Sequence, residues 1–188
     1  IPVKSAPVAP KTPIETNGYL FPLSEGSTRR ILSGISHDLT YASVFSFPVD
    51  GRGGVVYTAG ASGPAVRVAR SLGVAPLAVI SNFDGSNFTP ELAHNAMSGP
   101  TGDATIESIV EFALAEGFQG INIDFENMHP EDRQLYTSFM AALSRAAHAR
   151  GLSLSNAMAP KWADWPSLPW VGTFDYAALA PHLDFTML

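Results

Sequence analysis

The sequence contains no cysteine, and only 15% of its 188 residues are charged. The absence of cysteine excludes a disulfide scaffold, a cysteine-based zinc site and a thiol nucleophile. Basic residues are also few, with 11 Lys and Arg against 17 Asp and Glu, so the net charge is −6. Without a basic stripe to displace counterions, no nucleic-acid partner is expected. No segment approaches the ~18 apolar residues of a membrane span, so no membrane partner is expected either.

Nucleotide- and metal-binding motifs are missing as well. The first expected strand is not followed by G-x-G-x-x-G, which a dinucleotide-binding fold requires at that place. The phosphate loop G-x-x-x-x-G-K-[ST] does not occur, and the five histidines show no ligand spacing such as H-E-x-x-H. The sequence therefore predicts neither a cofactor nor a metal ion.

The chain does contain a repeated alternation of short apolar segments and amphipathic segments. The apolar segments predict strands at residues 18–22, 41–47, 75–83, 120–126, 152–159 and 183–188. Helices are predicted between them, from Ser27 or Thr28 to about His37, from Ser62 to Gly73, from Asp103 to Gly117 and from Pro130 to Gly151. This rhythm is typical of repeated β-α units, so the predicted fold class is α/β with a parallel sheet.

Two architectures fit this alternation, a doubly wound sheet and a (β/α)8 TIM barrel. The missing nucleotide motif favours the barrel. Because a barrel takes ~250 residues, we expect one truncated within strand 6, with residues 1–15 as a Pro-rich linker and 16–188 as the N-terminal part of the barrel. Such a piece would have two open sheet edges. It should be inactive unless the natural protein continues or a partner supplies the rest.

The segment FQGINIDFENMHP, residues 118–130, carries the strongest chemical signal. Side chains of a strand alternate between its two faces. One face therefore carries only the polar side chains of Asn122, Asp124 and Glu126, while the other face is apolar. Burying this row is costly unless the groups are paired or functional. The alternative is an edge strand with one solvated face, but its amphipathic neighbours favour a central strand and a functional row.

The motif GINIDFEN resembles the signature strand of family 18 glycoside hydrolases, Asp-Gly-x-Asp-x-Asp-x-Glu. It is more similar to the variant Gly-x-Asn-x-Asp-x-Glu-Asn of bacterial spore-cortex-lytic N-acetylglucosaminidases and related cell-wall glycosidases. The matching residues are Gly120, Asn122, Asp124, Glu126 and Asn127, whereas Gln119 replaces the first Asp. The segments NGYLFP, VFSFPVDGRGGV, APLAVISNF and NAMAPK resemble strands one, two, three and five. The resemblance covers about residues 17–188.

The resemblance implies retaining, substrate-assisted catalysis, in which the 2-acetamido oxygen of the sugar attacks its own anomeric carbon. In that reading Glu126 is the general acid and later the base for water. Asp124 orients the acetamido N–H, and Asn122 hydrogen-bonds Asp124. The Asp124 anion is expected to keep Glu126 protonated near neutral pH, because like charges raise one pKa of a pair.

Other side chains near the expected strand ends are candidates for substrate binding. Aromatic rings and an apolar wall suit a sugar face, although ordinary core packing is the alternative for each of them. Asn82, at the end of the third strand, is a candidate for a substrate hydrogen bond. Phe45, Phe83, Trp165 and Trp170 are further aromatic candidates of this kind. The substrate-binding residues that we favour are Tyr19, Phe47, Asn82, Met158 and Trp162.

The resemblance implies a secreted, cell-wall- or spore-associated hydrolase of β-linked N-acetylglucosamine glycans. Its expected partner is an N-acetylglucosamine-containing polysaccharide, peptidoglycan first and chitin second, with a possible upstream wall-binding module. The alternative is a catalytically silent glycan-binding protein on the same barrel, which the presence of Glu126 disfavours. The family also has a Met-x-Tyr-Asp motif on strand six and a Trp on strand eight, and we expect both beyond Leu188.

Overall fold

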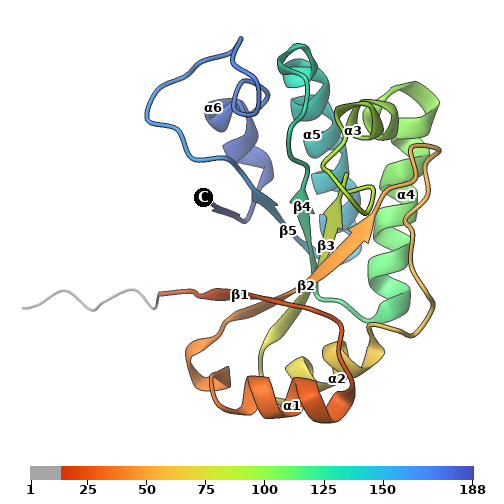
Figure 1. Cartoon of the computed structure of the whole chain (residues 1–188), viewed down its shortest axis with the longest axis vertical. Coiled ribbons are helices and arrows are strands. Elements are labelled where there is room, and N and C mark those ends of the chain that lie inside the picture. Colours follow the sequence, from red (N-terminus) through yellow and green to blue (C-terminus); the bar gives the residue numbers. More distant parts are fainter. Residues whose placement is uncertain (1–13) are drawn as a thin grey trace, which may run out of the picture.

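The computed structural model describes residues 14–188, so most of the expected linker lies outside the described residues. Six parallel strands form one sheet, and their order in space is their order along the chain (Figure 1). They are β1 (Asn17–Leu20), β2 (Tyr41–Pro48), β3 (Ala75–Ser81), β4 (Gly120–Asp124), β5 (Ser153–Ala157) and β6 (Phe185–Met187). This order confirms the α/β class and rules out a doubly wound sheet, in which the strand order reverses.

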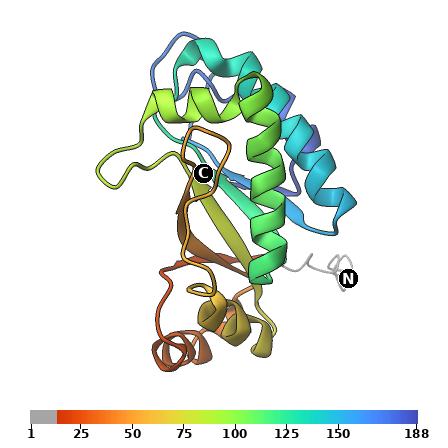
Figure 2. The same ribbon diagram turned by 90° about the vertical axis from the view of Figure 1, so that its right-hand side faces the viewer.

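Helices connect the strands, and α4 and α5 lie side by side along one face of the sheet (Figure 2). The α-helices are α1 (Glu25–Ser33), α2 (Gly63–Ser71), α3 (Pro90–Met97), α4 (Gly99–Glu116), α5 (Arg133–Ala149) and α6 (Tyr176–Leu179). Short 3-10 turns are η1 (Ser36–Asp38), η2 (Pro130–Asp132) and η3 (Ala180–His182). The main hydrophobic core lies between the helices and the sheet face that they cover. None of the described helices is long and apolar enough to cross a membrane.

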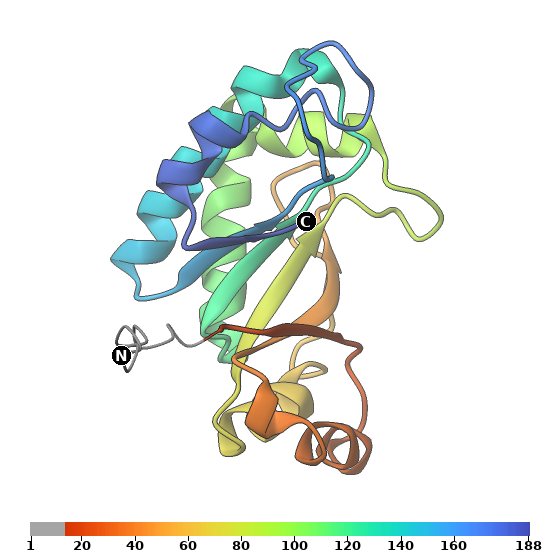
Figure 3. The same cartoon turned by 90° about the vertical axis from the view of Figure 1, so that its left-hand side faces the viewer.

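The sheet is curled into a half-barrel, as seen from its other side in Figure 3. The ring of Tyr41 on β2 stacks on the ring of Phe185 on β6, with 4.5 Å between the ring centroids. The side-chain amide of Asn17 on β1 lies 2.7 Å from the sulfur of Met187 on β6. Within residues 14–188, β1 and β6 each pair with one strand only. The two edges of the sheet therefore face each other without being joined.

The helix before β4 begins earlier than the sequence indicates. Helix α4 starts at Gly99 rather than at Asp103, and it follows the unpredicted helix α3 after the single residue Ser98. A Cβ at position 102 would lie 2.5 Å from the carbonyl oxygen of Met97, so glycine permits this tight junction. The predicted end is correct, because Gly117 adopts a left-handed conformation with φ of 82° and caps the helix.

The alternation of side chains along β2 is interrupted near its middle. Val44 pairs with Ala78, and Phe47 pairs with Ile80, so three residues of β2 span the length of two residues of β3. An extra residue of this kind reverses the alternation of side chains beyond it. Val44 and Phe47 therefore point to the same face of the sheet, the face that the helices cover.

The register shift decides where Phe47 lies. Its ring packs in the core against Phe112 and Phe118, with centroid distances of 4.6 Å and 5.7 Å. The structure contradicts the prediction that Phe47 contacts substrate, because its ring is buried in the core. The prediction assumes regular alternation along β2, which would put Phe47 on the same face as Phe45. Phe45 points to the concave face instead and lines the principal cavity there. A single inserted residue thus separates two aromatic rings that the sequence places together.

Candidate active site

The polar row of β4 lies on the concave face of the half-barrel. Strand β4 is central, pairing with β3 on one side and β5 on the other, and all five of its residues are buried. At the base of this row there is no room for a side chain, because a Cβ at position 120 would lie 2.1 Å from the hydroxyl of Ser153. Ile121 and Ile123 occupy the opposite face and join the main core. The predicted division of β4 into a polar and an apolar face is therefore present.

Asn122 is fully buried and forms hydrogen bonds with side chains of two other strands, β1 and the adjacent β5. Its side-chain oxygen accepts a hydrogen bond from the hydroxyl of Tyr19 on β1, at 3.3 Å. Its side-chain nitrogen donates to the hydroxyl of Ser155 on β5, at 3.0 Å. Within the described residues no hydrogen bond joins the side chains of Asn122 and Asp124, so the predicted hydrogen bond between them is absent; Asn122 bonds to Tyr19 and Ser155 instead. Asn122 supports the site from below rather than touching the upper carboxylate.

The side chain of Asp124 faces the cavity and forms no hydrogen bond within residues 14–188, and only 6% of the residue is exposed. Burial, and then the negative charge of Glu126, raise the pKa of Asp124 from 3.8 to about 7. Burial also raises the pKa of Glu126. The raised pKa expected for Glu126 is therefore present, but its cause is burial rather than the charge of Asp124, and the pKa of Asp124 is raised as well. Both carboxyl groups are therefore harder to ionise than in water.

Tyr19 lines the same cavity as the two carboxyl groups, with about half of its surface exposed. Burial, followed by the charges of Asp124 and Glu126, raises the pKa of Tyr19 above its ordinary value. The phenol therefore stays protonated and donates its hydrogen bond to Asn122. Tyr19 thus places a neutral hydroxyl and an aromatic ring beside two acidic groups.

Glu126 lies two residues beyond the end of β4, although the sequence predicted that the strand includes it. The side chain of Asn82, just after β3, accepts a hydrogen bond from the Glu126 N–H at 2.9 Å. The same side chain donates to the Glu126 carbonyl at 2.8 Å. The predicted hydrogen bond from Asn82 to substrate is contradicted, because Asn82 is fully buried and bound to the backbone.

Asp124 and Glu126 open into a mostly apolar cavity of about 570 Å³. Its other lining residues are Tyr19, Phe21, Phe45, Phe88, Ala157, Met158, Ala159, Pro160, Trp170, Met187 and Leu188. Two of the predicted binding residues, Tyr19 and Met158, are therefore brought together with the carboxylates. Glu126, Phe88 and Trp170 also line a second groove, of about 290 Å³. Glu126 therefore lines both the cavity and the groove, together with the aromatic side chains of Phe88 and Trp170.

The tryptophan that reaches the site is not the one that the sequence singled out. Trp162 is 90% exposed and lies against a separate hollow beside Lys161 and Tyr176, so the structure contradicts its predicted role. Trp170, eight residues later in the same loop, lines both the cavity and the groove. Both tryptophans follow β5, and only the path of the loop distinguishes them.

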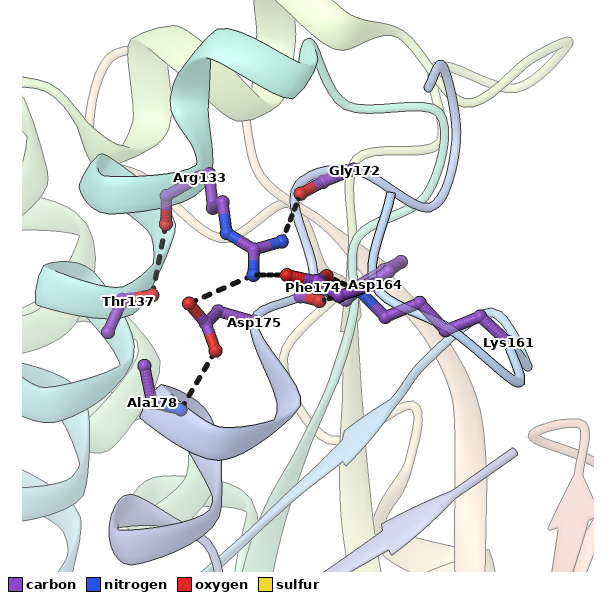
Figure 4. A network of polar contacts seen from close by, with 8 residues as sticks. All are labelled: Arg133, Thr137, Lys161, Asp164, Gly172, Phe174, Asp175 and Ala178. Carbon is purple, nitrogen blue, oxygen red and sulfur yellow. Dashed lines mark hydrogen bonds and ion pairs between the residues drawn. The ribbon is translucent and has the colours of Figure 1, made fainter. Parts of the chain in front are cut away.

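A network of charges sets the path of that loop (Figure 4). The Arg133 side chain, from the first turn of α5, donates to the carbonyl oxygen of Gly172 at 2.6 Å. It also contacts the carboxylates of Asp164 and Asp175, at 2.8 Å and 2.9 Å. Lys161 lies 2.7 Å from the second oxygen of Asp164, and it also donates to the Phe174 carbonyl. The base of the loop that carries Trp170 is thereby tied to α5.

Within residues 14–188, no group of three or more His, Asp or Glu side chains is arranged to hold a metal ion. The acidic pair at the cavity consists of two carboxylates only, Asp124 and Glu126. The arrangement offers a proton donor, a negative charge and aromatic surfaces next to one another. These are the elements of glycoside hydrolysis by acid catalysis.

No family model matches the sequence. In fold, the chain is similar to a chitinase from Chromobacterium violaceum, with a TM-score of 0.80 over 92% of this chain and 55% of that one. The sequence identity is 22%, so this likeness concerns the fold. The curled α/β half-barrel therefore matches part of a chitinase fold.

The chain is also similar in sequence to the cortical fragment-lytic enzyme of Bacillus subtilis, with 31% identity over 190 residues. The match covers 97% of this chain and 43% of that enzyme. The spore cortex-lytic enzyme SleL of Bacillus cereus is similar in structure, with 26% identity, a TM-score of 0.78 and coverage of 96% of this chain and 42% of that one. The homologues are thus lytic enzymes and chitinase-like glycosylases, and the chain spans less than half of the length of these two cortex-lytic enzymes.

Proposed function

We propose that this chain is part of a family 18-type glycoside hydrolase that cleaves β-linked N-acetylglucosamine glycans. The observation that carries the proposal is the buried Asp124 and the half-buried Glu126, which line the same aromatic-lined cavity. Peptidoglycan of the wall or spore cortex is the first substrate that we propose, since the relatives are named for cortex lysis. Chitin is the second. A secreted, wall- or spore-associated protein would meet these polymers.

We further propose that residues 16–188 are the N-terminal part of a complete (β/α)8 barrel. Two strands placed between β6 and β1 would join the facing edges of the curled sheet, in accord with the greater length of the relatives. Residues 1–15 would link the barrel to an upstream wall-binding module. The tests of activity described below use the polypeptide with its barrel complete.

The proposed mechanism uses the single proton that the carboxyl pair shares. We place this proton on Asp124 in the free site, since the pKa of Asp124 is about 7. When a substrate acetamido N–H donates to Asp124, it stabilises the anion and lowers the pKa of Asp124. The proton then passes to Glu126, which gives it to the leaving glycosidic oxygen as the acetamido oxygen attacks the anomeric carbon. Glu126 afterwards takes a proton from water, and the configuration at the anomeric carbon is retained.

The stereochemistry of the first product tests this mechanism. We expect NMR spectroscopy to detect the β-anomer before mutarotation, because two successive displacements restore the starting configuration. Substrates whose 2-acetamido group is replaced by a hydroxyl should not be cleaved. Formation of the α-anomer first would contradict substrate-assisted catalysis.

The substitution Glu126→Gln tests the role of the acid and separates the enzyme from a glycan-binding protein. Loss of the proton donor should lower kcat by about 10²–10⁴-fold, while binding of an N-acetylglucosamine oligomer persists. Glu107→Gln on the exposed side of α4 is the matched control and should retain full activity. If the unmodified protein binds oligomers but releases no product, the silent glycan-binding alternative is correct.

A further inference from the structure

Glu126, the proposed catalytic acid, lies beyond the last residue of β4 that pairs with β3. The regular pairing of β3 with β4 ends at Ser81 and Asp124. Glu126 is two residues further on, and Asn127 after it has a left-handed backbone with φ of 53°. Because a proton donor must lie within hydrogen-bond reach of the leaving oxygen, something other than the strand ladder has to hold the backbone of Glu126.

The side chain of Asn82 supplies that support. An amide side chain carries the same donor and acceptor as a peptide group. Asn82 uses both of them on Glu126, accepting from its N–H at 2.9 Å and donating to its carbonyl at 2.8 Å. It therefore adds one side-chain rung beyond the last backbone pair of β3 and β4. Asn82 is fully buried, so water does not compete for these hydrogen bonds.

The same amide closes the hairpin that follows β3. The second N–H of the Asn82 side chain donates to the Thr89 carbonyl at 3.0 Å, and the Thr89 N–H donates to the Asn82 carbonyl at 3.0 Å. Between Asn82 and Thr89 along the chain, Phe83 and Phe88 form an antiparallel β-bridge. The side chain of Asn127 donates to the Phe88 carbonyl at 3.2 Å. Two amides thus join the segment of the acid to the hairpin that carries Phe88.

We propose that Asn82 is a positioning residue of the catalytic acid, which it couples to the 83–88 hairpin. This inference rests on the proposed function, because it assigns the role of acid to Glu126. Asn82 acts through the backbone of Glu126 and does not touch the sugar. Its loss should therefore impair the chemical step more than it impairs ground-state binding of the glycan.

The substitutions Asn82→Ala and Asn82→Asp test the proposal. Near neutral pH, both should lower kcat by about 10–100-fold and change KM by less than about 3-fold, because misplacing a catalytic group by about 1 Å costs on this order. The Asn82→Asp variant keeps the acceptor for the Glu126 N–H but turns an oxygen toward two carbonyl oxygens. When protonated, the introduced carboxyl group regains one donor. The kcat of this variant relative to that of the unmodified protein should recover as the pH falls, whereas that of Asn82→Ala should not.

Hydrogen exchange of the Glu126 amide gives a readout that needs no activity. This amide should exchange slowly in the unmodified protein and at least about 10-fold faster in Asn82→Ala, if the Asn82 side chain is its protecting acceptor. Urea denaturation of each variant shows whether the native state persists under the assay conditions. Asn95→Asp is the matched control for the added charge, since Asn95 lies exposed on α3. It should leave both kcat and the exchange rate unchanged.

Three outcomes would overturn the proposal. These are an unchanged kcat in Asn82→Ala, a loss of activity that matches the unfolded fraction, and unaltered exchange of the Glu126 amide. Failure of the proposed function itself would look different. In that case the unmodified protein would release no product, or Glu126→Gln would retain activity. Faster exchange in Asn82→Ala would still show that the amide holds the Glu126 backbone.

Discussion

Asp124 is the group of the site that is most costly to ionise. Burial and the nearby Glu126 raise its pKa from 3.8 to about 7, so the folded protein binds the proton more tightly than the unfolded chain does. The favourable contribution of this group to folding is complete below about pH 4. It is lost as the pH rises to about 7, and above that the ionised group carries its full cost. The site therefore keeps a destabilising charge that the proposed reaction needs.

The substitution Asp124→Asn should make the protein more stable at high pH while it abolishes activity. The gain in free energy of unfolding should be small near pH 4 and grow to on the order of 1–4 kcal/mol at pH 8, because the amide has no charge to bury. Urea denaturation at several pH values measures it. Asp103→Asn, at an exposed position of α4, is the control and should show no comparable growth. A gain that is independent of pH would contradict the assignment of the proton to Asp124.

At the scale of single elements, β4 depends on a glycine at its buried base. A Cβ at position 120 would lie 2.1 Å from the Ser153 hydroxyl, 2.7 Å from a methyl group of Leu77 and 3.0 Å from the Ser153 backbone oxygen. The side chains can rotate, but the backbone oxygen belongs to β5 and cannot move alone. The close approach of β4 to β5 therefore requires a residue without a side chain at position 120.

We expect Gly120→Ala to lower the free energy of unfolding by about 1–3 kcal/mol, because the interior of the half-barrel has no room for the methyl group. Urea denaturation measures the loss. The matched control is Gly26→Ala in α1, where a Cβ would meet no atom within 4 Å. That change should be neutral or stabilising by about 0.5–1 kcal/mol. Equal effects at both positions would show that steric fit at the base of β4 does not matter.

The loop after β5 depends on a single arginine. Arg133→Gln should lower the free energy of unfolding by about 1.5–3 kcal/mol, because it removes charge-assisted hydrogen bonds to Asp164, Asp175 and Gly172. It should also raise KM, since Trp170 would no longer be held at the cavity. Denaturation, limited proteolysis of residues 160–172 and steady-state kinetics test these effects together.

The control for Arg133 is an arginine in a plain surface ion pair. Arg150 lies 2.9 Å from Glu111, and both side chains are at least half exposed. Arg150→Gln should therefore change the free energy of unfolding by only about 0–1 kcal/mol and leave KM unaltered. If the Arg133 variant behaves in the same way, the loop is held by packing rather than by its charges.

At the scale of the whole molecule, the open edges of β1 and β6 are the dominant feature. Unpaired strand edges are templates for association with other chains. We expect residues 1–188 alone to self-associate and to be inactive. The polypeptide that supplies the closing strands should be monomeric under the same conditions. Light scattering coupled to size-exclusion chromatography distinguishes these states. A stable, active monomer of residues 1–188 would contradict the proposed barrel closure.

The sequence by itself determined the α/β class, the six strands and the acidic row of β4. Apolar periodicity, caps such as Gly117 and strict alternation along residues 120–124 are local properties, so they can be read without the fold. The same locality explains why the site carboxylates Asp124 and Glu126 were predictable. Their spacing of two residues continues the alternation of the strand, although Glu126 itself lies beyond the end of β4.

Tertiary structure decided which other side chains reach the site. Phe47 turned to the core because β2 gained one residue against β3, and a register shift depends on the neighbouring strand rather than on the sequence of β2. Trp170 rather than Trp162 lies at the cavity, in a loop whose residues Asp164 and Gly172 are bound by Arg133, 31 and 39 residues earlier in the chain. Asn82 binds the backbone of Glu126 because the ends of β3 and β4 meet in space. Each of these placements depends on a contact between distant residues, which local pattern does not contain.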